Sequence, residues 1–366
     1  MIISVLLPTY RRPAHLAGCL DALAAQVRRP DEVLVVLRPE DDGSHAALAA
    51  WQQARRPAPF AVQAVAVTRP GFACARNAGR RRATGDVVAC IDDDARAPPD
   101  WLARLERWLA DPAVGAVGGR DRVHAHGRVV PAGPPGTIVG RVGWYGRLWG
   151  NHHRGSGRPR PVHFLKGCNM AFRRAGLPES DERLAGEQYL DEIDVCLGVG
   201  ARGARVIYDP VVRVDHYPAP VWTGGGRGAL SPPRIYALNC NYVYIMLKHL
   251  PRPRALAALA FTCCCARATY WGIAGFGWAW LATTVPRPPP PAPPPGRGDA
   301  ETRRRGEGSP ASPRHPVSTS GWGGVGGRGE LGSGPALGLR TVLLPALAGK
   351  LAGVRLYLAT KGSSEL

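Results

Sequence analysis

The sequence lacks the cysteine spacing of a zinc site and the opening of a secreted protein. None of its nine cysteines forms a Cys-x-x-Cys pair, and three of them are contiguous at positions 263–265, which is not zinc spacing. Reduced thiols in a cytosolic compartment are the simplest interpretation. Residues 1–4 include no basic residue, and the apolar run there is too short for a signal peptide. We therefore expect the folded part of the chain on the cytoplasmic side of a membrane.

Acidic residues are also scarce, with 28 Asp and Glu against 47 Lys and Arg and a formal net charge of +19. Residues 1–220 carry 30 basic and 23 acidic side chains, and residues 221–366 carry 17 and 5. The positive excess is therefore concentrated in the C-terminal part. This distribution favours attraction to an anionic membrane surface over a catalytic domain that binds nucleic acid, although charge alone excludes neither.

The first hundred residues alternate short apolar runs with helical patterns. Leu16, Leu20 and Leu23, for example, recur at the spacing of an amphipathic helix. We predict strands at residues 2–7, 33–37, 62–67 and 87–91, and helices at 13–30, 46–54 and about 71–84. Parallel neighbouring strands need crossover helices. The alternation therefore predicts an α/β fold with a doubly wound, mostly parallel sheet and flanking helices.

Polar segments follow three of these strands, at residues 9–11, 38–44 and 92–94. Ligands of open α/β sheets bind beyond the carboxyl ends of the strands, so we expect a site where these segments meet. The last segment is three adjacent aspartates, and an oxygen-rich cluster of this kind suits a hard divalent cation such as Mg²⁺ or Mn²⁺. A solvated acidic turn before the next helix is the alternative for the triplet taken alone.

The character of the sequence changes after residue 220. Within a helical region over residues 221–285, the apolar stretch 268–285 is at the short limit for spanning a bilayer, and a buried helix is the alternative. Residues 286–335 are rich in Pro and Gly and predict a disordered linker. The domain boundaries we predict are thus a main domain over 1–220, then 221–285, 286–335 and 336–366.

The last of these parts contains a helical pattern of its own. Its apolar residues recur at alternating spacings of three and four: Leu344, Leu347, Leu351, Val354 and Leu358. Lys350, Arg355 and Lys361 lie between or just after them. This pattern predicts a basic amphipathic helix suited to an anionic membrane face. A helix that packs onto the main domain is the alternative.

Several short segments occur in a characteristic order along residues 2–218: Pro8-Thr9-Tyr10, Asp41-Asp42-Gly43-Ser44, Ala75-Arg76-Asn77-Ala78-Gly79, Gly85-Asp86, Ile91-Asp92-Asp93-Asp94, Gly167-Cys168-Asn169-Met170-Ala171 and Asp191-Glu192-Ile193-Asp194. Each segment is weak by itself. Together they resemble glycosyltransferase family 2, whose members have the GT-A nucleotide-sugar fold. The resemblance implies inverting transfer of a sugar from a nucleotide diphosphate sugar to an acceptor hydroxyl.

The resemblance also implies a divalent cation, Mg²⁺ or Mn²⁺, that neutralises the leaving diphosphate. Asp92 and Asp94 correspond to the family's Asp-x-Asp metal and ribose motif, with Asp93 as a supporting middle residue. His216 follows a late strand, where similar enzymes often carry a histidine that reaches the metal or the diphosphate. A structural histidine is the alternative for this position.

The acceptor hydroxyl must lose a proton as it attacks, which calls for a general base. Similar enzymes supply it from an acidic pair near the end of the domain, and here the pair is Asp191-Glu192. Glu192 matches the usual base position, and Asp191 is the second candidate because the order of the pair is inverted. Asp194 is expected to cap or orient the helix that follows. An acidic helix start, favoured by the helix dipole, is the alternative for all three.

The remaining donor contacts are implied by the same resemblance. They are base and ribose contacts at Thr9, Tyr10, Arg11 and Asp42, a phosphate or ribose contact at Arg76, and close approach of the donor sugar at Gly167 and Asn169. An insertion at residues 37–40 makes Asp42 the weakest of these matches. Arg76 as a solvated helix charge is the alternative at that position.

The sequence also bears on the acceptor. It lacks the Gln-x-x-Arg-Trp signature of polymerising members, which favours addition of a single sugar. Acceptors of similar enzymes are saccharides, lipid-linked saccharides and cell-envelope polysaccharides, which fits a basic tail at the cytoplasmic face of a membrane. Two rival functions are a metal-dependent nucleotidyltransferase and a basic nucleic-acid-binding protein. A nucleotidyltransferase usually has a Gly-rich phosphate loop near its first strand, and residues 6–12 contain none. A nucleic-acid-binding protein is expected to have basic residues interleaved with aromatic ones on its folded domain, whereas the positive excess here lies in the C-terminal part.

Overall fold

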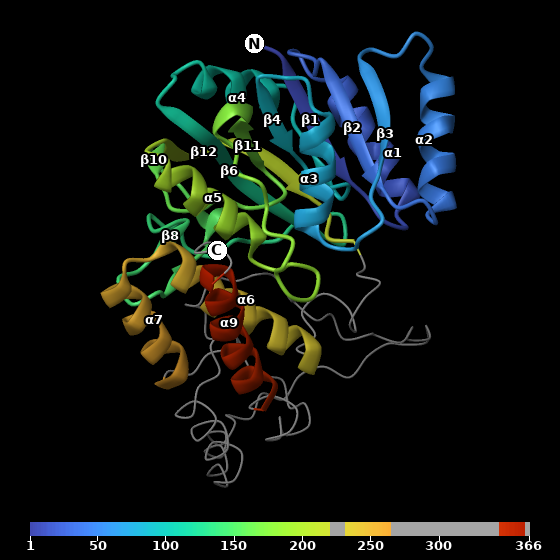
Figure 1. Ribbon diagram of the computed structural model, residues 1–366. Coiled ribbons are helices and arrows are strands. Elements are labelled where there is room, and N and C mark those ends of the chain that lie inside the picture. The colour runs from blue at the N-terminus through green and yellow to red at the C-terminus, as the bar shows by residue number, and fades with distance from the viewer. Residues whose placement is uncertain (220–230, 265–343, 363–366) are drawn as a thin grey trace, which may run out of the picture.

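The computed structural model describes residues 1–219, 231–264 and 344–362 (Figure 1). A central sheet has the strand order β10-β12-β6-β11-β4-β1-β2-β3, with β5 paired to β12 and β7 to β6. The strands of this sheet are β1 (Ile3–Pro8), β2 (Glu32–Leu37), β3 (Ala61–Ala66), β4 (Val87–Cys90), β5 (Ala95–Arg96), β6 (Val114–Ala125), β7 (Arg128–Val129), β10 (Arg160–Pro161), β11 (Met170–Arg173) and β12 (Arg205–His216). β8 (Arg141–Val142) and β9 (Leu148–Trp149) form a separate pair.

Helices cover both faces of this sheet. They are α1 (Pro13–Ala24), α2 (Asp42–Ala54), α3 (Phe72–Arg82), α4 (Trp101–Leu109), α5 (Asp191–Ala201), α6 (Pro232–His249), α7 (Arg252–Cys264) and α9 (Leu344–Gly362), with short 3₁₀ turns at His152–Arg154 and Arg174–Gly176. One core packs α1, α2 and α4 against the sheet, and the other packs α3, α5 and α6 against the opposite face. The predicted doubly wound α/β fold is confirmed. β1 pairs in parallel with β2 and β4, and β11 is inserted antiparallel between β4 and β6.

Two helix boundaries differ from the prediction, each for a local reason. Helix α2 begins at Asp42, four residues earlier than predicted, because the Asp41 side chain caps it by accepting a hydrogen bond from Ser44 N at 3.2 Å. Helix α1 ends at Ala24 and not near residue 30. The chain between α1 and β2 is instead held by Gln26, whose amide donates to the Pro98 carbonyl at 2.7 Å.

A bulge in β12 determines what lies at the carboxyl edge of the sheet. Asp209 pairs with Gly119 of β6, but Arg213 pairs with the next residue, Arg120, so three residues of β12 have no partner in this register. The strand crosses Gly119 so closely that a Cβ there would lie 1.7 Å from the Val212 carbonyl oxygen. Beyond the bulge, β12 pairs with β5, and this brings His216 beside the acidic triplet.

The C-terminal helices lie below the sheet in Figure 1, on the side opposite the N-terminus where β1 begins. Helix α9 packs against α6 so closely that Cβ atoms at Gly349 and Gly353 would lie 2.3 and 2.5 Å from the carbonyl oxygens of Tyr236 and Cys240. No helix among the described residues combines the length and the apolar character needed to cross a bilayer. The apolar stretch 268–285 and the linker 286–335 lie outside the described residues, so their predictions stay predictions.

We expect Gly119→Ala to destabilise the fold by about 3 kcal/mol, because its methyl group would overlap backbone atoms that cannot move without breaking the β6–β12 pairing. Gly200→Ala in α5 is the matched control, since no atom lies within 4 Å of a Cβ at that position, and alanine favours the helix. Urea unfolding followed by circular dichroism measures both. Equal stabilities of the two variants would contradict the role of this crossing.

Candidate active site

The three aspartates after β4 have different surroundings. Asp93 is buried, and its carboxylate accepts hydrogen bonds from Thr9 Oγ1 at 2.7 Å and from Arg12 Nη1 at 2.9 Å. Burial and the nearby Asp94 raise the pKa of Asp93, while Arg12 opposes this rise. The middle carboxylate therefore ties the loop after β1 to the loop after β4, which agrees with the predicted supporting role.

Asp92, Asp94 and His216 form the first cluster of possible metal ligands. One ligand atom from each lies within 4.8 Å of the other two. Asp94 is fully buried, its Oδ1 lies 3.2 Å from His216 Nε2, and its Oδ2 accepts from Ala219 N at 3.0 Å. Two carboxylates and one imidazole are a donor set that suits Mn²⁺ or Mg²⁺. The three residues that the sequence predicted as metal ligands thus lie together.

A second cluster shares His216 and adds Asp121 and Cys168. Burial raises the pKa of the Cys168 thiol well above its usual value, and the charge of Asp121 raises it further. Sulfur is also a soft ligand that hard cations such as Mg²⁺ disfavour. This chemistry favours the cluster that contains Asp92 and Asp94 as the place for a hard cation.

The two acidic residues at the start of α5, Asp191 and Glu192, have different surroundings. Asp191 Oδ2 lies 2.5 Å from Arg76 Nη2, and both side chains are buried. Arg76 also donates to Ser180 Oγ at 3.1 Å. Burial, reinforced by the charge of Asp191, raises the pKa of Glu192 to about 7. Asp191 is thus engaged by Arg76, and Glu192 can exchange a proton near neutral pH.

Lys166 lies within electrostatic reach of both acidic groups. Burial by itself would lower the pKa of this lysine, but the acidic neighbours Asp121, Glu192 and Asp92 raise it. Its ammonium group therefore stays protonated between the metal-ligand cluster and Glu192. A Cβ added at the next residue, Gly167, would meet no atom within 4 Å, so a ligand can approach the backbone there.

The loops after β1 and β2 meet through a residue that the sequence prediction missed. Asp41 is buried and accepts a hydrogen bond from Arg11 N at 2.6 Å. Asp42, which the sequence favoured, is exposed in the first turn of α2. The ring of Tyr10 is covered by Arg38, whose Cζ lies 4.3 Å from the ring centre. A base that stacks on Tyr10 would share or displace that arginine.

The amide of Asn169 is engaged by other parts of the fold. The residue is fully buried, and its amide is used by three structural partners: Oδ1 accepts from Trp101 Nε1 at 2.9 Å, and Nδ2 donates to the carbonyls of Arg120 and Val212 at 3.2 and 3.0 Å. These contacts tie β6 and β12 to the loop before β11. They favour a supporting role for Asn169 over the direct donor contact that the sequence suggested.

A second group of polar residues, which the sequence did not reveal, holds α5 to α6. Lys248 Nζ lies 2.8 Å from Asp194 Oδ1 and 3.2 Å from Asp181 Oδ2. His249 Nε2 is 2.7 Å from Asp194 Oδ1, and the Tyr244 hydroxyl donates to Asp181 at 2.6 Å. Asp194 thus orients the helix that carries Glu192, as the sequence predicted for this residue.

Comparison with known proteins identifies the domain. Residues 4–179 match the model of glycosyl transferase family 2. A glucosyl-dolichyl phosphate glucuronosyltransferase of Haloferax volcanii is 33% identical over 159 residues, which cover 40% of this chain and 47% of that protein. The succinoglycan biosynthesis protein ExoM of Rhizobium meliloti is 34% identical over 116 residues, covering 32% of this chain and 37% of that protein. The chain therefore spans about half or less of the length of these relatives.

The solved structures agree with this result at the level of the fold. The crystal structure of GalNAc-T7 with UDP, GalNAc and Mn²⁺ superposes with a TM-score of 0.52 at 16% identity, covering 68% of this chain and 48% of that chain. The architecture is the GT-A fold. Residues 4–179 thus form a domain that matches glycosyltransferase family 2.

We expect Lys248→Met to lower the free energy of unfolding by about 2 kcal/mol, because it leaves Asp181 and Asp194 without a shared cation. Lys361→Met, at an exposed position near the end of α9, is the matched control. Burial opposes ionisation of both aspartates, but hydrogen bonds and the Lys248 charge lower the pKa of each. Their contribution is therefore present above the unfolded pKa of about 4 and is lost as the pH falls below it.

The difference between Lys248→Met and the wild type should accordingly shrink below pH 4. Urea unfolding at pH 7 and at pH 3 to 4 measures it. A Lys248→Met protein as stable as the Lys361→Met control at pH 7 would show that the bridge contributes nothing.

Proposed function

We propose that this protein transfers a single sugar from a nucleotide diphosphate sugar to an acceptor hydroxyl, with inversion at the anomeric carbon and with the help of Mg²⁺ or Mn²⁺. The observation that carries the proposal is the separation of two acidic groups at the carboxyl edge of one sheet. Asp92 and Asp94 gather around His216, and Glu192 stands apart with a pKa raised to about 7. The first group is suited to hold a cation that neutralises the leaving diphosphate, and Glu192 is suited to accept a proton.

Asp92, Asp94 and His216 are the residues that would hold the cation. A bound divalent ion neutralises negative charge that develops on the diphosphate as the bond to the sugar breaks. Thr9, Tyr10, Arg11 and Asp42 line the loops proposed to receive the nucleoside, and the open backbone at Gly167 gives room for the sugar. The structural relative with UDP, GalNAc and Mn²⁺ supports this distribution of roles through its fold.

Asp92→Asn and Asp94→Asn should each reduce metal-dependent release of nucleotide from a sugar donor by at least about 100-fold, because a neutral amide holds a divalent cation poorly. The control variant Asp100→Asn removes the same charge at the start of α4, outside the site, and should remain active. Release is measured with a coupled nucleotide assay, and Mn²⁺ binding by electron paramagnetic resonance. Undiminished turnover and Mn²⁺ binding in both site variants would remove the basis of the proposal.

Glu192 is the proposed general base. Its carboxylate takes the proton of the acceptor hydroxyl as that oxygen forms a bond to the anomeric carbon, and the diphosphate leaves with the electrons of the bond that breaks. Asp191 supports the base indirectly: its ion pair with Arg76 keeps a negative charge beside Glu192, which raises the pKa of Glu192. Arg76, buried in that pair, is proposed to anchor α5 as well as to lie near the donor.

We expect Glu192→Gln to lower kcat by about 100-fold or more while the donor still binds, because an amide cannot accept the proton. Wild-type activity should rise with pH through about 7, where the raised pKa of Glu192 places loss of its proton. The exposed Glu179→Gln is the control. Initial rates between pH 5.5 and 8.5 and donor binding by calorimetry test both points. A fully active Glu192→Gln protein would shift the role to Asp191.

The acceptor is proposed to be a saccharide or a lipid-linked saccharide in glycolipid or cell-envelope polysaccharide synthesis, at the cytoplasmic face of a membrane. The printed names of the two curated relatives, one acting on glucosyl-dolichyl phosphate and one in succinoglycan biosynthesis, support this class. The concentration of positive charge after residue 220 supports a peripheral attachment. With the domain assigned to family 2, neither rival function has an observation in its favour.

A further inference from the structure

Helix α9 presents two different faces, and only one of them packs against other residues that the structure describes. Its small residues Ala346, Gly349 and Gly353 are buried against α6. The leucines at spacing seven lie on the outside: Leu344, Leu351 and Leu358 are 50%, 63% and 61% exposed. Residues seven apart share one stripe of a helix. The packing alternative from the sequence therefore holds for this helix, and an outward stripe of leucine remains exposed.

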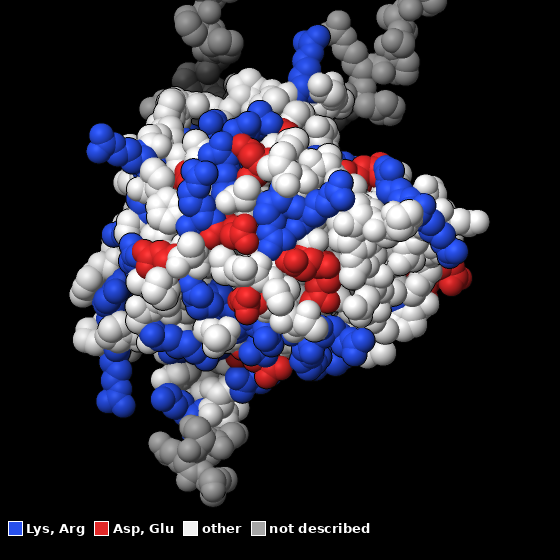
Figure 2. Space-filling view, turned by 90° about the horizontal axis from the view of Figure 1, so that it is seen from above, with Lys and Arg blue, Asp and Glu red and all other residues white. Residues whose placement is uncertain are grey.

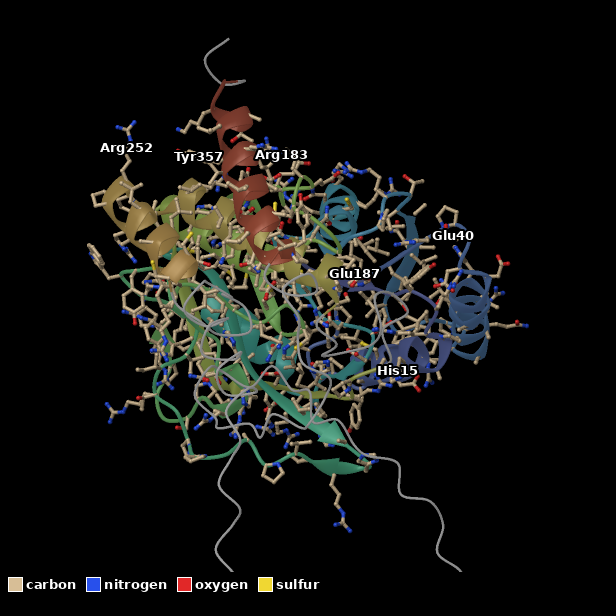
Figure 3. The ribbon with its side chains drawn as sticks, turned by 90° about the horizontal axis from the view of Figure 1, so that it is seen from below. His15, Glu40, Arg183, Glu187, Arg252 and Tyr357 are labelled. Carbon is tan, nitrogen blue, oxygen red and sulfur yellow. The ribbon has the colours of Figure 1, made fainter. Side chains whose placement is uncertain are left out.

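The neighbouring helix α7 extends this surface. Lys350 of α9 turns inward and donates to the Thr262 carbonyl of α7 at 2.7 Å, so the two helices are joined. Leu256 of α7 is 64% exposed. We call the outward leucines of α7 and α9 the leucine face. Seen from below (Figure 3), α7 and α9 lie at the same side of the molecule, and Arg252 at the start of α7 points away from it.

The charge of these helices is of one sign. The described parts of the chain that contain α6, α7 and α9 include seven Lys and Arg residues and no Asp or Glu: Arg234, Lys248, Arg252, Arg254, Lys350, Arg355 and Lys361. Lys248 and Lys350 are turned inward by their hydrogen bonds. The opposite end of the molecule, shown in Figure 2, mixes acidic and basic side chains. Exposed leucines thus coincide with positive charge that no acidic residue of the same helices balances.

We propose that the leucine face inserts into the interfacial region of a membrane that contains anionic lipids. Apolar side chains surrounded by basic ones are the pattern by which helices lie on such a surface. Charge disfavours a second copy as the occupant, because it would bring the same positive helices. Anionic lipid headgroups carry the negative charge that would pair with these basic residues.

Docking through the leucine face would also determine how far the candidate site lies from the membrane. The C-terminal helices lie on the side of the sheet opposite the N-terminus, where the parallel strands end and the candidate site is built. Attachment through these helices would hold the site close to the bilayer, within reach of an acceptor carried by a lipid. Only this consequence rests on the proposed transferase function; the docking itself does not.

The test compares binding of the full chain to sedimented vesicles of phosphatidylcholine alone and with 30% phosphatidylglycerol. We expect the wild type to bind the anionic vesicles preferentially. The double variant Leu351→Ser/Leu358→Ser should bind them at least about tenfold more weakly, from the apolar area withdrawn. Arg355→Glu should weaken binding about fivefold or more and reduce its salt dependence. Val27→Ser, which alters an exposed apolar residue far from these helices, is the control and should bind like the wild type.

Several outcomes would overturn the proposal. If the double leucine variant bound anionic vesicles as strongly as the wild type, other parts of the chain would be responsible for membrane attachment. Equal binding to neutral vesicles would remove the role of charge, and a dimer in lipid-free solution that the leucine changes abolish would assign the face to a second copy. Thermal melting checks that each variant is folded. Nucleotide release with a soluble acceptor should be unchanged in the leucine variant, so loss of docking and failure of the proposed reaction are separate results.

Discussion

Burial of carboxylates at the edge of one sheet is the constraint on which the rest of this structure depends. A buried carboxylate is costly unless a cation or hydrogen bonds compensate it. Arg12 compensates Asp93, Arg76 compensates Asp191, and Lys248 compensates Asp194. Arg12 precedes α1, Arg76 lies in α3 and Lys248 in α6, so the same pairs that make burial tolerable also fasten the loops and helices around the site.

The compensated carboxylates define the ones left for chemistry. Asp92 and Asp94 lie around the imidazole of His216, an arrangement that suits an external cation. Glu192 lies beside the carboxylate of Asp191 and has the raised pKa expected of a group that exchanges protons near neutrality. The division that we propose is therefore between acids whose main partner is a cation of the chain and acids grouped where a ligand can bind. It explains why adjacent acidic residues can have different roles.

Much of the fold could be predicted because its signals are local. Strands buried on both faces are almost wholly apolar, as in β1 and β2 apart from Ser4 and Glu32. Polar residues at their carboxyl ends indicate the edge where ligands bind. The acidic triplet was predicted in this way, whereas His216 and the acidic pair of α5 were predicted only from the family resemblance. Three contacts could not be predicted from the sequence, because each depends on a partner from another element and no local pattern indicates it. They are the contacts of Asp41 with Arg11, of Lys248 with Asp194, and of Arg38 with the ring of Tyr10.

Helix α9 illustrates the same division. Its sequence determined an amphipathic helix with basic residues, since the spacing of its leucines depends only on the helical repeat. Which face packs was decided by the tertiary structure, because only glycine and alanine allow α9 to approach the backbone of α6. Likewise, the sequence by itself determined an acidic triplet at the end of a strand and a histidine far downstream. The bulge in β12 brought them together, because the register of two strands is fixed by how their backbones pack and not by either sequence alone.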